Sequence, residues 1–78
     1  MMYDFYKILG VERNASVSQI KLAYRQKAKL YHPDVNKSAS AHDFFTVLNS
    51  AHETLCDEKK RKRYDLKLDY QHFHQANS

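Results

Sequence analysis

The chain has 78 residues, enough for one small domain, and its 42% hydrophobic and 28% charged residues are typical of a globular protein. It has a formal net charge of +4 and contains a single glycine and a single proline. Because tight reversals and phosphate-binding loops depend on these two residue types, the composition excludes hairpin-rich sheets, glycine-cradled phosphate loops and dinucleotide fingerprints. We therefore expect an all-helical domain.

The first predicted helix is short. Asp4 can cap its N-terminus, and Gly10, the only glycine, follows it where a left-handed backbone conformation is favoured. We expect Tyr6 and Leu9 in this segment to be structural residues.

A second helix should begin after Ser16, because Ser16 and Gln19 have the spacing of a capping box. It should end before Pro33, whose ring disfavours the α conformation in the preceding residue. Apolar residues recur along it at steps of three and four, the period of one helix face. They are Ile20, Tyr24, Ala28 and Tyr31, of which Ile20, Ala28 and Tyr31 are expected to be structural.

Residues 34–40 are small and polar and predict a loop, and Ser40 followed by Asp43 indicates the start of a third helix. The apolar stripe of this helix is the strongest in the chain, and it should face the second helix in an antiparallel pair. The stripe consists of Ala41, Phe44, Phe45, Leu48, Ala51 and Leu55, with Leu48, Ala51 and Leu55 as expected structural residues.

Asp57 can cap a short fourth helix that presents Tyr64 to the core. Arg61 on this helix could pair with a carboxylate of the loop. Beyond Asp65 the sequence permits continued helix or fraying, and residues 71–78 are typical of a tail. We therefore expect a domain over residues 1–66, followed by a helical extension or flexible tail over residues 67–78.

Charge is segregated along the chain. Residues 13–33 contain five cations and no carboxylate, whereas residues 34–58 contain five carboxylates and one cation. Lys21, Arg25 and Lys29 recur at every fourth residue and so share one face of the second helix. A cationic face without nearby acidic residues predicts an acidic partner surface.

Several sequence blocks, in a fixed order, carry the most specific information. They are Asp4–Val11, Ile20–Arg25, Tyr31–Asp34, Phe45–Leu48 with Asn49 and Ala51–Leu55, and Arg61 with Tyr64 and Asp65. Together they resemble the J domain of DnaJ-type co-chaperones over about residues 3–66. The tripeptide His-Pro-Asp is a weak motif alone, but at the end of a basic helix and among the other blocks it is highly specific.

This resemblance implies a small all-α J-domain fold. In that fold the second and third helices form an antiparallel hairpin, accompanied by a short N-terminal helix and a short C-terminal helix. The implied function is to bind a DnaK-type chaperone of the heat-shock-70 class and to stimulate its ATP hydrolysis, which promotes client capture and protein folding. The chemistry would belong to the partner, so we expect the chain to be no enzyme and to need no cofactor.

The resemblance also implies residue roles. Asp34 would engage an arginine of the chaperone, because an arginine and a carboxylate form a strong, oriented pair. His32 and Pro33 would fix the loop that presents Asp34. The other partner-binding residues implied by the resemblance are Lys21, Tyr24, Arg25, Lys29, Asn36 and Phe45.

Four positions depart from the usual pattern of the family. Val35 stands where a basic residue commonly follows the tripeptide, and Gln26 lacks a positive charge often found there. Lys27 replaces a frequent leucine, and His52 replaces a frequent tyrosine. These departures leave the motif in place and bear on affinity and on the choice of chaperone.

Two other functions fit parts of the sequence. The run from Lys59 to Arg63, or the second helix, could contact phosphates, which makes a basic nucleic-acid-binding module one alternative. A J-like module that recruits a chaperone without activating it is another. For the run itself we favour a solvated helix surface, and we expect no nucleic acid partner.

The remaining features predict further absences. A lone cysteine, Cys56, cannot form an internal disulfide and favours a cytoplasmic or other reducing compartment. The histidines lack the spacing of a zinc site, and no apolar run is long enough to span a membrane. We therefore expect no metal, no membrane contact from these residues and a monomer whose clients are bound by regions outside this chain.

Overall fold

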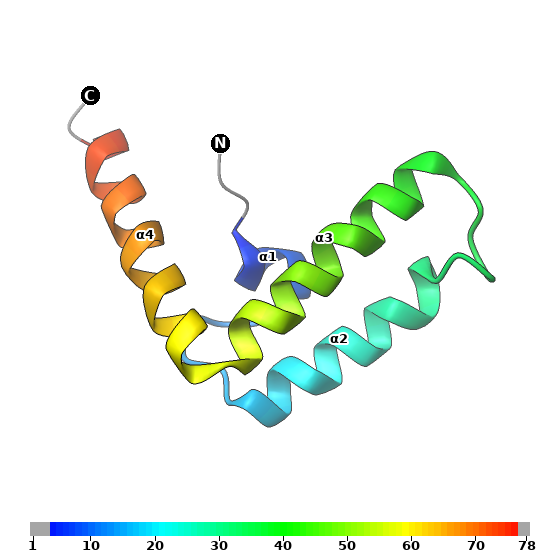
Figure 1. Cartoon of the computed structure of the whole chain (residues 1–78), viewed down its shortest axis with the longest axis horizontal. Coiled ribbons are helices and arrows are strands. Elements are labelled where there is room, and N and C mark those ends of the chain that lie inside the picture. The colour runs from blue at the N-terminus through cyan, green and yellow to red at the C-terminus, as the bar shows by residue number, and fades with distance from the viewer. Residues whose placement is uncertain (1–3, 77–78) are drawn as a thin grey trace.

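A computed structural model describes residues 4–76 of the chain and the side chains of residues 4–71. Its helices are α1 (Phe5–Leu9), α2 (Val17–Tyr31), α3 (Ala39–Cys56) and α4 (Glu58–Ala76). In Figure 1, α2 and α3 lie side by side and antiparallel, α1 lies against α3, and α4 departs at the end opposite the α2–α3 loop. The all-α class and the antiparallel hairpin are confirmed.

Local capping explains where α1 and α2 begin and end. Asp4 accepts hydrogen bonds from the backbone N–H groups of Tyr6 and Lys7 at 3.0 and 3.3 Å. Gly10 ends α1 with φ 73° and ψ 37°, the left-handed region where a side chain is costly. At α2, Ser16 and Gln19 form both bonds of the predicted capping box, and the helix ends at Tyr31, before the proline.

The predicted start of the third helix is wrong by two residues. Ser38, rather than Ser40, caps α3, because its hydroxyl accepts the N–H of Ala41 at 3.2 Å while its own backbone is extended. Ser40 lies within the first turn of α3. The side-chain oxygen of Asn36 accepts bonds from both the N–H and the hydroxyl of Ser38, which fixes the cap.

The core lies where α1, α2, α3 and α4 meet. Most residues expected to be structural are buried there, namely Tyr6, Leu9, Ile20, Leu48, Ala51, Leu55 and Tyr64. The remaining two, Ala28 and Tyr31, are half-buried, and the Tyr31 ring lies 4.5 Å from the Phe44 ring between their centroids. The core is therefore concentrated at the α1 and α4 end of the hairpin and thins toward the loop.

The fourth helix is longer than the short helix expected: α4 has 19 residues and continues beyond Asp65, which is one of the two alternatives that the sequence left open. Asp57 caps it as predicted, accepting the N–H of Lys60 at 2.9 Å. Tyr64 and Leu68, one turn apart, are both buried, and no glycine or proline interrupts residues 58–76. The helix continues because its second buried residue contributes to the same core. The domain boundary expected at residue 66 stays a prediction and falls inside this helix.

Arg61 does not pair with a carboxylate among the described residues, in contrast to our expectation. Its guanidinium donates to the backbone carbonyls of Ala15 and Arg13, at 2.7 and 2.9 Å, and to the Tyr6 hydroxyl at 3.1 Å. Tyr6 in turn donates to Asp65 at 2.6 Å. Arg61 thus ties α4 to α1 and to the segment that leads into α2.

Candidate functional site

The α2–α3 loop reverses the chain at residues 32–36. The backbone carbonyl of His32 accepts hydrogen bonds from the N–H groups of Val35 and Asn36, each at 2.9 Å. Pro33 restricts its own φ and has no N–H that needs a partner. The hydrogen-bonded turn therefore holds Asp34 in a defined place at the far end of the hairpin.

Asp34 presents its carboxylate to solvent. Its backbone N–H donates to Nδ1 of His32 at 3.1 Å. The carboxylate oxygen lies 3.6 Å from the same Nδ1, beyond hydrogen-bonding distance. The Asp34 side chain is 88% exposed. Both carboxylate oxygens are thus available to an incoming donor.

Asn36 has a role inside the loop. It is half-buried, and its side-chain oxygen accepts both bonds from Ser38 described above. This arrangement links the end of the turn to the cap of α3. The contact of Asn36 with a partner stays a prediction.

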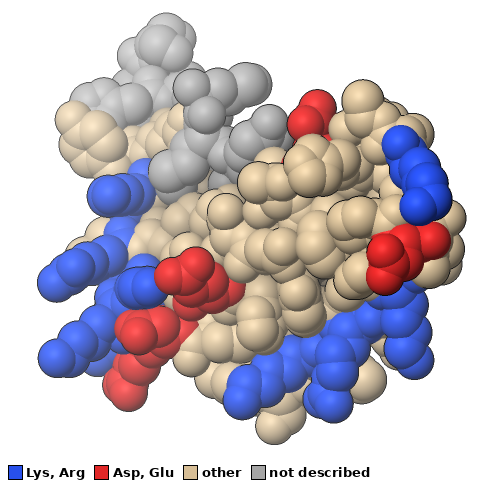
Figure 2. Space-filling view, turned by 45° about the vertical axis from the view of Figure 1, so that its right-hand side comes forward, with Lys and Arg blue, Asp and Glu red and all other residues tan. Residues whose placement is uncertain are grey.

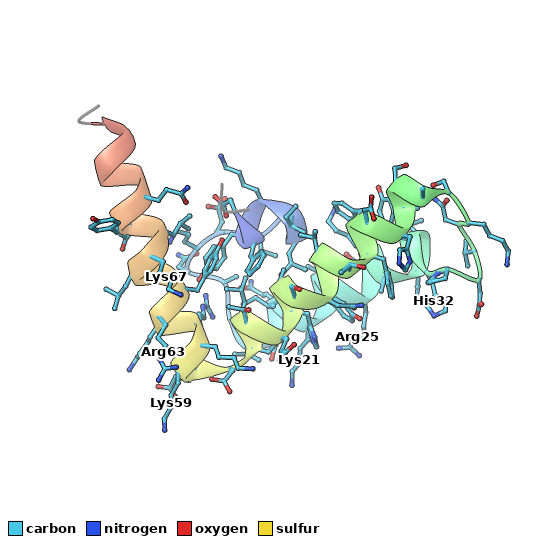
Figure 3. All side chains as sticks on the ribbon, turned by 45° about the horizontal axis from the view of Figure 1, so that its top comes forward. Lys21, Arg25, His32, Lys59, Arg63 and Lys67 are labelled. Atoms are coloured by element: carbon cyan, nitrogen blue, oxygen red, sulfur yellow. The ribbon has the colours of Figure 1, made fainter. Side chains whose placement is uncertain are left out.

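The cationic residues of α2 form an exposed face. Lys21, Arg25 and Lys29 are all exposed, and no ion pair among the described residues includes them. Figure 3 shows Lys21 and Arg25 along α2, with His32 farther along toward the loop. Figure 2 shows this group of Lys and Arg at the lower right, separate from a second group over α4 at the left. The face thus approaches the loop from one side.

An open groove of about 810 Å³ lies between this face and the loop. Its lining residues are Leu22, Arg25, Gln26, Ala28, Lys29, His32, Asp34 and Val35. The structure thereby brings two predicted cations together with two residues of the tripeptide. Lys21 and Tyr24 do not line the groove.

Sequence reasoning assigned no partner-binding role to Leu22 and Val35, two apolar residues of this groove. Leu22 is 54% exposed and Val35 is 70% exposed, and both line the same groove. Leu22 could have been found from its place off the apolar side of its helix. Val35 was recognised as a departure from the family pattern but not as part of a surface.

Side chains of α3 contact Tyr24 and His32 and hold them in place. The Tyr24 hydroxyl donates to the side-chain oxygen of Asn49 at 2.5 Å, and the His52 ring stacks on the Tyr24 ring with centroids 4.1 Å apart. Burial lowers the pKa of His52 below its usual value, and the positive charge of Lys21 lowers it further. Phe45 is half-buried and meets the His32 ring edge to face at 5.5 Å. No signal within α2 predicts the support from Asn49 and His52, because both come from the opposite helix. The partner contact expected of Phe45 stays a prediction.

Other chemistry finds little support in the part of the chain that the structure describes. No three His, Cys, Asp or Glu side chains gather there in a way that could hold a metal ion. Burial raises the pKa of the half-buried Cys56 thiol, which disfavours the nucleophilic thiolate. Across the same residues, no helix combines the length and apolar character needed to cross a membrane.

Comparison with known proteins gives consistent similarities. The sequence model for the DnaJ domain matches residues 4–65. The chaperone protein DnaJ of Dictyoglomus thermophilum is 53% identical over 62 residues, and so is that of Exiguobacterium sibiricum. Each alignment covers 80% of this chain but only 16% and 17% of the respective relative. The chain therefore spans a small part of the length of these curated relatives.

A solved structure is similar as well. The crystal structure of the J-Trx1 fragment of ERdj5 matches with a TM-score of 0.76 and 42% sequence identity. The match covers 82% of this chain and 31% of that chain.

Proposed function

The chain belongs to the DnaJ domain family, and on that premise we propose that it binds a DnaK-type chaperone and stimulates its ATP hydrolysis. The contact surface comprises the loop of residues 32–36, the cationic face of α2 and the groove between them. In this proposal the chain catalyses no reaction itself.

One observation carries the proposal: the Asp34 carboxylate is 88% exposed on a loop whose backbone is held by hydrogen bonds. An exposed carboxylate carried on this backbone can accept two parallel bonds from an arginine of the partner. Because the turn is already formed, little conformational entropy is lost when the loop binds.

The α2 face would act together with this carboxylate. Lys21, Arg25 and Lys29 attract an acidic surface, which speeds encounter and sets orientation. The exposed side chains of Leu22 and Val35 in the groove offer apolar area to a partner side chain. Since Val35 is uncharged, the basic residue that commonly follows the tripeptide in the family would be missing from the arginine contact of Asp34.

Stimulation requires more than attachment. Binding accelerates the partner's hydrolysis only if the chain binds the hydrolysis-competent state of the chaperone more tightly than its resting state. Asp34 is the residue we assign to this discrimination, and the α2 cations are assigned to affinity. The two roles can be separated by experiment.

The test is single-turnover ATP hydrolysis by a DnaK-type chaperone, with the parent chain, with Asp34→Asn and with Glu12→Gln. Asp34→Asn should keep the fold and abolish stimulation, because the amide removes the charge from an exposed side chain. Glu12→Gln removes an exposed carboxylate from the segment before α2 and should leave stimulation unchanged. Full stimulation by folded Asp34→Asn would contradict the mechanism. Binding without stimulation by the parent chain would instead indicate a recruitment module.

Three wider expectations remain proposals. A reducing compartment rests on the lone Cys56. A monomeric state rests on the small size of the domain. Client binding is assigned to regions outside this chain, since its relatives are several times longer.

A further inference from the structure

The outer face of α4 combines cations with exposed apolar side chains. Lys59, Arg63 and Lys67 recur at every fourth residue, and Leu66 and Tyr70 lie between and beyond them. Leu66 is 70% exposed and Tyr70 is 67% exposed. We call these five residues the α4 outer face.

This face points away from the core. The core side of α4 is marked by the buried Tyr64 and Leu68. Leu66 and Tyr70 each follow one of these by two residues, which is a rotation of about 200° in an α-helix. The exposed apolar pair therefore lies on the opposite side of the helix, with Arg63 and Lys67 along one edge.

Local ion pairs account for two other cations of α4. Lys60 contacts Glu53 of α3 at 2.9 Å, and Lys62 lies 3.8 Å from Glu58. No ion pair among the described residues includes Lys59, Arg63 or Lys67. Figure 3 shows these three side chains following one another along α4. They are the cations of this helix left for an external partner.

A small hollow adjoins these cations. It has a volume of about 250 Å³ and is lined by Thr54, Lys60, Arg63, Tyr64 and Lys67. Three of its five lining residues are cationic, while the Tyr64 ring supplies apolar surface. An acidic side chain of moderate length fits this chemistry.

The opposite edge of α4 is acidic. Asp65 and Asp69 lie there and engage Arg13, at 3.6 and 2.6 Å. Figure 2 shows further acidic side chains beside the Lys and Arg group at the left. A nucleic-acid backbone or an anionic lipid surface is negative throughout and would gain no attraction at this edge. A protein helix can place its own carboxylates along one flank only, opposite the cations.

From these observations we infer that the α4 outer face binds an acidic amphipathic helix of another protein. Its apolar residues would cover Leu66 and Tyr70, and its carboxylates would meet Arg63 and Lys67. The contact follows the usual geometry of a helix laid along a partly apolar surface.

The position of this face allows two partners at once. The α2–α3 loop and α4 lie at opposite ends of the molecule in Figure 1, and His32 is far from the three α4 cations in Figure 3. A protein held at α4 would leave the loop accessible. The inference does not rest on the proposed function, and its test makes no use of a chaperone.

The test uses two synthetic peptides as probes, both forming amphipathic helices with leucines on one side. One carries glutamates along one flank, and the other carries glutamines at the same positions. Affinity is measured by fluorescence anisotropy, and the binding site is located by amide chemical shifts of the isotope-labelled chain. The glutamate peptide should shift amides of residues 59–70 and should bind about five- to tenfold more tightly than the glutamine peptide, as expected for two exposed charge pairs.

Matched variants separate this face from net charge. Arg63→Gln with Lys67→Gln should reduce affinity for the glutamate peptide to that of the glutamine peptide. Lys7→Gln with Lys37→Gln removes the same charge elsewhere and should retain the parent affinity. Leu66→Ser should weaken binding of both peptides. Spectra of each variant establish that it is folded.

Several results would overturn the inference. Equal affinity for the two peptides would remove the electrostatic argument, and shifts located on α2 would remove the assigned site. Equal weakening by both double variants would show a general charge effect. Tighter binding of duplex DNA or of phosphatidylglycerol vesicles than of the glutamate peptide would assign the face to a different class of partner.

Discussion

At one end of the α2–α3 hairpin, α1, α4 and the segment before α2 close over a buried core, whereas at the other end the loop leaves Asp34 almost fully exposed. At the core end side chains bond across the chain: Tyr64 accepts the N–H of Phe5 at 2.8 Å, and their rings stack with centroids 4.7 Å apart. At the loop end the hydrogen bonds join residues only a few positions apart. The core end therefore stabilises the fold, and the loop end presents Asp34 to a partner.

The hydrogen bonds of the core end also keep the Tyr6 hydroxyl protonated. Burial raises the pKa of the Tyr6 hydroxyl, and its bond to Asp65 raises it further. The hydroxyl is thus held as a donor to Asp65 while it accepts from Arg61. Changes here should alter folding, while changes at the loop should alter binding with little effect on folding.

The largest expected effect on folding comes from Arg61→Met. The substitution keeps an unbranched apolar stem but removes the donors to the carbonyls of Ala15 and Arg13 and to Tyr6. Losing these bonds, two of which are partly buried, should lower the free energy of unfolding by about 1–3 kcal/mol. Urea denaturation followed by circular dichroism measures the loss. Stimulation of a chaperone by the folded fraction should be retained.

Arg63→Met serves as the control for that prediction. Arg63 is exposed and faces away from the segment before α2, so its loss should change stability by less than about 0.5 kcal/mol. Similar destabilisation by the two substitutions would show that the bonds of Arg61 add nothing to the core end.

An intermediate effect is expected at the start of α3. Ser38→Ala removes the acceptor for the N–H of Ala41 and one partner of Asn36, and it should cost about 1 kcal/mol. Ser40→Ala places a good helix former within the first turn and should be neutral or slightly stabilising. The reverse order in thermal melts would restore Ser40 as the cap. If folded Ser38→Ala stimulated a chaperone less than the parent chain does, the cap would also position the loop.

The same contrast explains what the sequence could predict. The caps of α1 and α2 were predicted because the capping bonds of Asp4, Gly10, Ser16 and Gln19 join residues only a few positions apart. For α3, two hydroxyl residues lie two positions apart, and the bond from Ser38 to Asn36 favours one of them. Local patterns thus locate a helix but do not always select its first residue.

Long-range contacts limited the remaining predictions. The length of α4 depends on Leu68 reaching the common core, and the partners of Arg61 are backbone carbonyls, which no residue type reveals. At the site, the family resemblance identified residues 32–34 directly from the sequence. The groove with Leu22 and Val35 depends on how the loop folds beside α2, so spacing along the sequence could not indicate it.

The smallest predicted effect concerns His52, which lies between the two ends and supports Tyr24. Its pKa is lowered by burial and, to a lesser extent, by Lys21, so the unfolded chain binds a proton more readily than the folded chain. The lowered pKa of His52 should therefore cost no folding stability above the ordinary histidine pKa of about 6.5. Below that pH the free energy of unfolding should fall as the pH drops. His52→Phe keeps a ring against Tyr24 and removes the titration, so its melting temperature should change less between neutral and mildly acidic pH. Lys21→Met should reduce this pH dependence only in part, because burial is the larger cause of the lowered pKa. If His52→Phe left the pH dependence unchanged, other groups would be responsible for it.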